Sequence, residues 1–250
     1  KDKKSKMSWT TKDYESFYPT DVMETGWDIL FFWVARMIML GIYRTGKVPF
    51  KTIYLHGLVR DKDRQKMSKS KGNVIDPLGI SEIYGADALR MALITSGAAG
   101  TDPVISEEKI RGYRNFATKL WNITRFILMN YDVKLEEIKP KFSTEDKRIE
   151  AELKKIKAKV TKEIDSYRFH EAASTAYQYI WHTFADKILE ASKPRLTSED
   201  LGERKAAQEL NMEILIACLK LLHPFMPFVT EEIYQQLPLK QKNVLMVEKW

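Results

Sequence analysis

Two kinds of hydrophobic pattern alternate in the first hundred residues. "DVMET", residues 21–25, is predicted to be a short strand closed by Gly26. "KTIYLHGLV", residues 51–59, is rich in β-branched and aromatic residues and predicts a second strand. Between them, Asp28–Leu40 is apolar on almost every side, so we expect a helix buried on most of its faces. A second helix is expected from about Ala86, with Asp87 in its first turn. This order predicts an α/β domain with a parallel sheet.

The pattern changes after the small-residue stretch Thr95–Pro103, and little strand signal follows it. A polar leader (1–12), an α/β domain (13–100) and an all-α part (101–250) are therefore predicted. Pro194 is expected to end the second of three apolar stripes, and Pro227 to open a last helix at its first position. The stripes have helical spacing and predict a bundle: Ile149, Leu153, Ile156, Val160 and Ile164; Ala173, Tyr177, Ile180, Phe184, Ile188 and Ala191; Leu210, Ile214, Ala217 and Leu221.

Composition narrows the class of protein. A hydrophobic share of 44% and a charged share of 30% are typical of a globular chain, and the net charge of +7 favours a polyanionic partner such as nucleic acid. The single cysteine, Cys218, lies in an apolar run and is expected to be a core residue. Neither it nor the four histidines have the spacing of a metal site, so we predict no structural metal.

The most apolar stretch, residues 29–43, contains Arg36 and is too short for a comfortable membrane span. No secretory signal is visible, so we expect a cytoplasmic protein without a membrane partner. The chain starts at Lys1 rather than at methionine, which suggests an internal piece of a longer protein.

One stretch offers chemistry. "DRQKMSKSKGNVIDP", residues 63–77, follows the second predicted strand and carries Lys66 and Lys69 among serines. The compact charge of lysine suits a phosphate ligand, and open α/β sheets bind ligands at the carboxyl ends of their strands. A cradle for a triphosphate is therefore predicted, with Gly72 giving the loop freedom to move. A solvated basic loop is the alternative.

The core of this stretch, "KMSKS" at Lys66–Ser70, matches the second signature of the class I aminoacyl-tRNA synthetases. The wider "HGLVRDKDRQKMSKSKGNVIDP" resembles the branched-chain members of that family. The resemblance implies ATP as substrate, accompanied by Mg²⁺, with Lys66 and Lys69 as catalytic cations that stabilise the triphosphate while pyrophosphate leaves. It also implies that ATP is bound by His56, Gly57, Lys66, Met67, Ser68, Lys69 and Ser70. For His56, an ordinary histidine at a strand end is the alternative.

"YPTDVMETGWDILFFWVARM", residues 18–37, resembles the valyl members rather than the leucyl, isoleucyl or methionyl ones. The resemblance implies that Asp28 pairs with the α-ammonium group of valine, while Ile29 touches its side chain and Trp33 walls the pocket. An apolar wall separates valine from a homologue only weakly, a limit for which the valyl and isoleucyl enzymes are the standard example. Ordinary core packing of Ile29 and Trp33, and a helix-dipole role for Asp28, are the alternatives.

The helical half resembles the stem-contact and anticodon-binding regions of the family. The matching segments are residues 114–128, 169–196 and 221–237, which are mostly packing residues. Arg111, Arg114 and Lys119 are possible tRNA phosphate contacts, for each of which a solvated basic face is the alternative.

Two features of the family are absent from this sequence: its first signature, His-x-Gly-His, and its inserted editing domain. We therefore expect the C-terminal half of a Rossmann-like class I catalytic domain plus a helical anticodon-binding bundle, inactive alone. The N-terminal catalytic half and the editing domain would be its partners. The whole enzyme is expected to activate valine with ATP and to transfer it to tRNA(Val). An isoleucyl enzyme, or a free-standing tRNA-binding module with a relic loop, are the alternatives.

Overall fold

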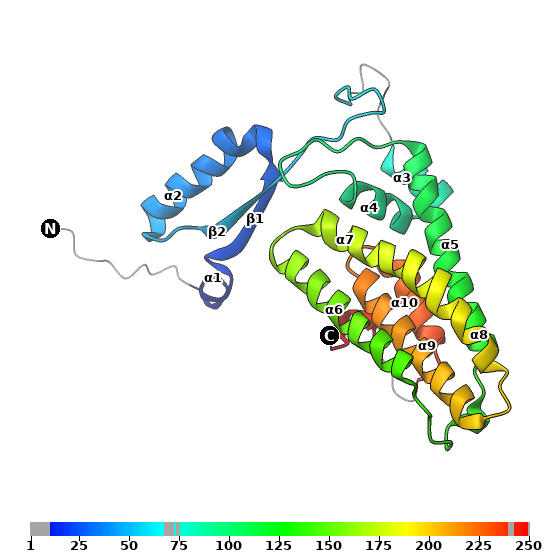
Figure 1. Cartoon of the computed structure of the whole chain (residues 1–250). Coiled ribbons are helices and arrows are strands. Elements are labelled where there is room, and N and C mark those ends of the chain that lie inside the picture. Colours follow the sequence, from blue (N-terminus) through cyan, green and yellow to red (C-terminus); the bar gives the residue numbers. More distant parts are fainter. Residues whose placement is uncertain (1–10, 68–72, 74–75, 240–242, 250) are drawn as a thin grey trace. The chain divides into compact units, whose positions relative to one another are not determined.

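The computed structural model describes residues 11–67, 73, 76–239 and 243–249. These residues form two compact units (Figure 1). The small unit comprises the described residues up to Leu58 together with Ala99–Asp102. The helical unit comprises Val59–Ala98 and the chain from Pro103 onward. Within these ranges every helix is too short or too polar to cross a membrane.

The small unit is a β-α-β element preceded by a short helix. Strands β1 (Thr20–Gly26) and β2 (Phe50–His56) pair in parallel, with Thr20 opposite Phe50 and Gly26 opposite His56. Both strands were predicted and are confirmed, although β2 ends at His56 rather than at Val59. It ends there because the Leu58 N–H turns aside and donates to Asp102 Oδ1 at 2.8 Å. The helix that precedes them is α1 (Lys12–Phe17).

The connection between the strands corrects the predicted buried helix over Asp28–Leu40. The chain forms a 3₁₀ turn η1 (Trp27–Ile29), a π-helical turn η2 (Leu30–Val34) and only then α2 (Ala35–Thr45). Of the residues in these three elements only Val34 is buried, and the expectation of burial on most faces is wrong. A two-stranded sheet can cover one narrow stripe of a helix, so most of the apolar faces remain exposed.

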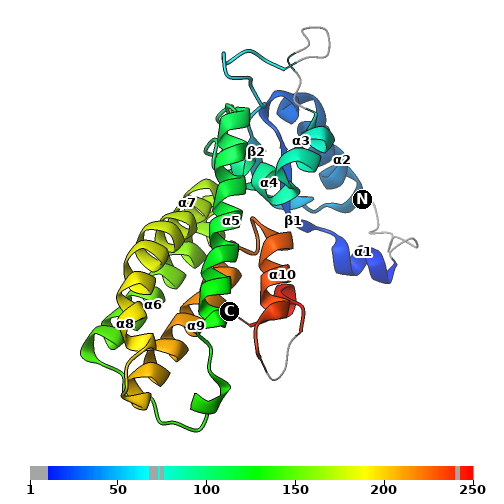
Figure 2. The same ribbon diagram turned by 90° about the vertical axis from the view of Figure 1, so that its right-hand side faces the viewer.

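The helical unit contains long helices joined by short turns (Figures 1 and 2). α10 lies beside α5 and α9, and α7 packs on α6. Its helices and turns are α3 (Pro77–Tyr84), α4 (Ala86–Ile94), α5 (Glu107–Met129), η4 (Val133–Leu135), α6 (Thr144–Asp165), α7 (Phe169–Gln178), η5 (Tyr179–Leu189), α8 (Glu190–Leu196), α9 (Leu201–Leu222), α10 (Pro227–Gln236) and η6 (Leu245–Val247). The predicted bundle is confirmed, and so is the start of its last helix at Pro227.

The predicted stripes line the core, with two corrections in the second one. Ala191 is exposed and Ser192 is buried in its place, because η5 is π-helical and shifts the phase of the buried face. Pro194 does not end the helix but lies inside α8, which runs two residues further to Leu196. Cys218 is buried as expected, and burial raises the pKa of its thiol.

Helix α4 is fastened to the junction between α9 and α10 by two side chains. Buried Asp87 accepts hydrogen bonds from the backbone N–H groups of Phe228 (3.3 Å) and Val229 (2.6 Å) at the start of α10. Burial raises the pKa of Asp87, although these two bonds oppose the shift. Arg90 donates to the carbonyl oxygens of Phe225 (3.2 Å) and Pro224 (3.1 Å), just after α9. One turn of α4 therefore satisfies backbone groups at two helix ends.

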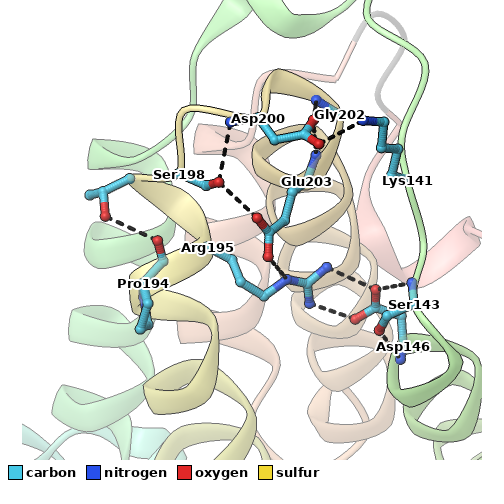
Figure 3. Close-up of polar contacts among 10 residues, drawn as sticks. Lys141, Ser143, Asp146, Pro194, Arg195, Ser198, Asp200, Gly202 and Glu203 are labelled. Carbon is cyan, nitrogen blue, oxygen red and sulfur yellow. Dashed lines mark hydrogen bonds and ion pairs between the residues drawn. The ribbon is translucent and has the colours of Figure 1, made fainter.

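A second polar cluster joins the N-terminus of α6 to the C-terminus of α8 and the N-terminus of α9 (Figure 3). Ser143 and Asp146 form a reciprocal capping box at the N-terminus of α6. The Asp146 side chain has no exposed surface, and both its oxygens accept from Arg195, at 2.6 and 2.8 Å. Glu203 lies 3.7 Å from Arg195 Nε and accepts from Ser198 Oγ. Burial raises the pKa of Asp146, but the bonds from Arg195 and Ser143 outweigh it and hold that pKa below its usual value.

Candidate functional site

The carboxyl ends of the two parallel strands bring Asp28 and His56 together. Gly26, the last residue of β1, pairs with His56, the last residue of β2, and Asp28 follows two residues later. A Cβ on Gly26 would lie 2.7 Å from Asp28 Oδ1 and 3.5 Å from His56 Cε1. The carboxylate and the imidazole therefore flank one glycine at the edge of the sheet where ligands of α/β folds bind. An exposed carboxylate here can pair with a cationic group such as an ammonium.

The ring of His56 is oriented by groups of the protein. Its Nδ1 lies 2.9 Å from the carbonyl oxygen of Gly57, and its Nε2 lies 3.4 Å from Glu24 Oε1. Both side chains of the second pair are about half exposed, so the pair is a surface contact. Glu24 belongs to β1 and was missed by sequence reasoning, because only the strand register places it beside β2.

Gly57 is required by a close approach of two backbone segments. A Cβ on this residue would lie 1.9 Å from the carbonyl oxygen of Thr101 and 2.7 Å from Asp102 Cα. Asp102 Oδ1 accepts from Leu58 N at 2.8 Å and from Trp27 Nε1 at 3.2 Å. Asp102 therefore ties the segments that follow β1 and β2, a role that its position in a small-residue loop did not reveal. Side-chain-free Gly57 fits this packing whether or not a ligand approaches it.

Ile29 and Trp33 are both exposed, at 43% and 54%. Trp27, Phe31 and Phe32 are exposed beside them along the chain, so this stretch offers an apolar surface. Ile29 ends a 3₁₀ turn and Trp33 lies in a π-helical one, so the two residues do not lie on one regular α-helix. Their contact with an amino-acid side chain stays a prediction.

Of the lysine signature, Lys66 and Met67 lie in the described part of the chain. Ser68, Lys69 and Ser70 lie outside it, so the structure does not place them. The side chain of Lys66 is exposed, and its backbone forms an antiparallel bridge with Arg60. Lys66 follows β2 along the chain, and its contact with a ligand stays a prediction.

Three cations of α5 were predicted to contact tRNA phosphates. Arg111 and Arg114 are exposed and three residues apart, so they neighbour each other on the helix surface. Lys119 differs, because its Nζ lies 2.7 Å from Asp186 Oδ1 and 4.3 Å from the centre of the Trp181 ring. The bond from Lys119 lowers the pKa of the Asp186 carboxyl. Arg111 and Arg114 are therefore better placed than Lys119 to bind a phosphate.

Two family models match separate parts of the chain. The family described as "tRNA synthetases class I (I, L, M and V)" matches residues 3–106, and "Anticodon-binding domain of tRNA ligase" matches residues 146–250. The chain belongs to the class I aminoacyl-tRNA synthetase family. The first match contains the strand-end residues and the lysine signature, and the second contains most of the bundle.

Curated relatives of this synthetase chain carry the name valine–tRNA ligase. The protein from Syntrophotalea carbinolica is 47% identical over 94% of the chain, and that from Pelagibacter ubique is 48% identical over 96%. The protein from Thermotoga maritima is 45% identical over 98% of the chain. The chain spans 27–28% of the length of these relatives.

Solved structures show that the fold is shared more widely within the synthetases. Mycobacterium tuberculosis methionyl-tRNA synthetase in complex with methionyl-adenylate superposes with a TM-score of 0.75 at 24% identity, covering 91% of this chain and 47% of that one. The leucyl enzyme of Agrobacterium radiobacter K84, solved in a ternary complex with tRNA, gives 0.71 at 20% identity, covering 93% and 28%. The predicted fold class, part of a Rossmann-like catalytic domain followed by a helical anticodon-binding domain, is confirmed.

Proposed function

We propose that this chain is the part of a valine–tRNA ligase that carries the lysine signature and the anticodon-binding bundle. The main support for this proposal is the 45–48% identity to valine–tRNA ligases over at least 94% of the chain. The longer enzyme joins valine to the α-phosphate of ATP and then transfers the valyl group to the 3′ end of tRNA(Val) in the cytoplasm. The N-terminal catalytic half and an editing domain are the partners that complete it.

In the first step an oxygen of the valine carboxylate attacks the α-phosphorus of ATP. The bond from that phosphorus to the oxygen bridging it to the β-phosphate breaks, and pyrophosphate leaves with the electron pair. Negative charge grows on the leaving group, and the ammonium charges of Lys66 and Lys69 stabilise it. Met67, Ser68 and Ser70 are further ATP-binding residues of the loop in this proposal.

Valine binds at the ends of the two strands in this proposal. The exposed Asp28 carboxylate pairs with the α-ammonium group, and Ile29 with Trp33 forms the apolar wall for the isopropyl group. His56 and Gly57 line the adenosine on the neighbouring strand end. The proximity of Asp28 and His56 around Gly26 supports this arrangement, since valine and the α-phosphate must meet.

Mg²⁺ in this proposal travels with the ATP phosphates. Among the residues that the structure describes, no group of three His, Cys, Asp or Glu side chains could hold a metal ion. Phosphate oxygens and water would then be most of the ligands of Mg²⁺, which is common in nucleotide sites.

Pyrophosphate exchange tests the choice of amino acid. The full-length enzyme should exchange pyrophosphate into ATP with valine, much faster than with isoleucine, whereas the 250-residue chain alone should not exchange at a useful rate. Valine-independent or isoleucine-preferring exchange by the full-length enzyme would contradict the proposal. Robust exchange by the 250-residue chain would contradict the need for the missing half.

Single-turnover adenylate formation tests the lysines. Lys69→Ala should slow this step about 10²–10³-fold while valine binding changes little, because the charge acts where the transition state develops. Lys66→Ala should slow it less. Lys62→Ala is the matched control, since it removes an exposed lysine of the same segment that lies outside the signature. Equal effects of Lys69→Ala and Lys62→Ala would show that the signature lysine has no special role.

A further inference from the structure

The turn that leads into Lys66 is built around one carboxylate. Asp61 Oδ1 accepts hydrogen bonds from the backbone N–H groups of Asp63, at 3.0 Å, and Gln65, at 2.8 Å. Backbone bonds close the same turn, from Arg64 N to Asp61 O at 2.9 Å and from Asp61 N to Gln65 O at 3.1 Å. Arg64 has a φ of 60°, the left-handed conformation that such a tight turn requires. Asp61 therefore fixes the path of the backbone into the lysine signature.

The same carboxylate also binds a residue twelve positions later. Asn73 Nδ2 donates to Asp61 Oδ2 at 2.7 Å, and it reaches the carbonyl oxygen of Lys66 at 3.4 Å. The Asn73 amide thus joins the turn that precedes the signature to the first residue of the signature. A contact between the ends of a segment of this length reduces the conformational entropy that is lost when the segment binds a ligand.

The turn is anchored to the helical unit through Arg60. This residue forms an antiparallel bridge with Lys66 on one side and a parallel bridge with Val104 on the other. Its N–H donates to Pro103 O at 2.9 Å, and its carbonyl accepts from the N–H of buried Ile105 at 3.1 Å. The backbone of Lys66 is therefore fixed, through a single intermediate residue, to the segment that enters α5.

We propose that Asp61 and Asn73 are positioning residues that clamp the turn before Lys66 to Asn73 and so fix the place of Lys66. The inference rests on the proposed function, in which Lys66 acts on the phosphates of ATP. The Asp61–Asn73 clamp does not contact ATP itself. The clamp positions the ammonium group of Lys66 for the transition state. Loss of the clamp therefore lowers the rate of adenylate formation and leaves the affinity for valine unchanged.

An exchanged pair of residues separates the clamp from general effects of substitution. Asn73→Asp places a second carboxylate against Asp61 and turns the bond into a repulsion. Adding Asp61→Asn restores a donor and an acceptor at the contact between residues 61 and 73, with their positions exchanged, and Asn still offers Oδ1 to the two backbone N–H groups. The matched control is Asp63→Asn with Asn73→Asp, which has the same net charge as the exchanged pair but keeps the repulsion. The contact of Asn73 Nδ2 with Lys66 O is lost in both double variants, so it does not affect their comparison.

The first measurement is amide hydrogen exchange of the 250-residue chain, which needs no catalytic activity. Asn73→Asp should raise the exchange rate of the amides of Asp63 and Gln65 several-fold, while the amides of α9 exchange as in the wild type. The exchanged pair should restore slow exchange and the control double variant should not. Wild-type exchange in Asn73→Asp would overturn the clamp.

The second measurement is single-turnover adenylate formation by the full-length enzyme. Asn73→Asp should slow this step about tenfold, the typical effect of losing one charge-assisted hydrogen bond, with an unchanged KM for valine. The exchanged pair should recover most of the rate, and the control double variant should stay slow. Equal rates for the two double variants would overturn the positioning role. An inactive wild-type enzyme would instead contradict the proposed function, and hydrogen exchange would still decide whether the clamp exists.

Discussion

Two runs of this chain have the same apolar character and end in opposite surroundings. The run that enters α2 holds Phe31, which is 78% exposed, whereas Leu219, in an equally apolar run of α9, is fully buried. α9 is packed by α5, α6, α7, α8 and α10, so each of its faces meets another helix. Among the described residues of its unit, the first run has two strands and one short helix, α1, as packing partners. Local sequence therefore shows how much apolar surface is available for burial. The number of packing partners decides how much of that surface becomes buried.

Core truncation should show the largest difference between the two units. Phe184→Ala removes a fully buried ring from the helical unit and should lower its free energy of unfolding by about 3–5 kcal/mol. Phe31→Ala, the same change at an exposed ring of the small unit, should stay within about 0.5 kcal/mol. Urea unfolding of the 250-residue chain, followed by far-UV circular dichroism, measures both.

The Phe31 result has a counterpart in the longer enzyme of the proposed function. There Phe31→Ala should become destabilising, because the remaining half of the catalytic domain would cover this apolar surface. A Phe31→Ala enzyme that is as stable at full length as the wild type would show that the surface stays exposed.

Breaking the polar cluster of the helical unit should have a somewhat smaller effect. Asp146→Ala leaves Arg195 without its bidentate partner and removes one half of the α6 capping box, for an expected loss of about 3 kcal/mol. Glu145→Ala is the matched control, since it breaks an exposed pair with Arg148 one residue earlier and should change stability little. Similar losses from the two variants would show that burial does not decide the strength of the pair.

The same residue should contribute to acid sensitivity. The folded protein holds the pKa of Asp146 below its usual value, so this carboxylate stabilises the fold above about pH 4 and loses that contribution as the pH falls through the folded pKa. The difference in unfolding free energy between wild type and Asp146→Asn should therefore be largest near pH 7 and shrink below pH 4. A difference that is constant between pH 7 and pH 3 would contradict this assignment.

The smallest expected effect concerns tRNA and contrasts two exposed arginines with a lysine that is paired with Asp186. The 250-residue chain should bind tRNA(Val) weakly, with an affinity that falls as salt rises. Replacing Arg111 and Arg114 by alanine should reduce the slope of log K against log salt by about 0.7–0.9 for each phosphate that the variant no longer neutralises. Lys119→Ala should leave the slope unchanged, because Lys119 already pairs with Asp186. Filter binding over a salt series measures this, and a larger effect of Lys119→Ala would reverse the assignment.

The sequence predicted the elements of the fold better than their detailed geometry. Residue type in short runs found both strands, helical spacing found the bundle, and Pro227 marked the start of α10. Helical spacing missed the π-helical turns at η2 and η5, since nothing in an apolar run marks the one extra residue per turn. Pro194 misled the prediction because the helix continues past it to Leu196, although proline cannot donate the usual bond to the preceding turn.

The candidate site was predictable only where a motif announced it. The lysine signature and Asp28 were found by their resemblance to a family. Glu24, Asp61, Asn73 and Asp102 were not found, because each acts through strand register or through a hydrogen bond to a distant backbone or side-chain group. Such residues carry no local pattern, and only the folded chain shows what they hold.

The fastening of α4 has a consequence for how the chain can vary. Asp87 and Arg90 bind backbone N–H and carbonyl groups of residues 224–229, not their side chains. Exposed Phe228 can therefore change in volume and polarity without disturbing these four bonds, whereas Phe225 and Met226 of the same segment are buried in the core and cannot. Asp87 and Arg90 have no such freedom. At this junction α4 depends on the identity of two side chains. The segment that they bind depends on its backbone path and on its two buried side chains.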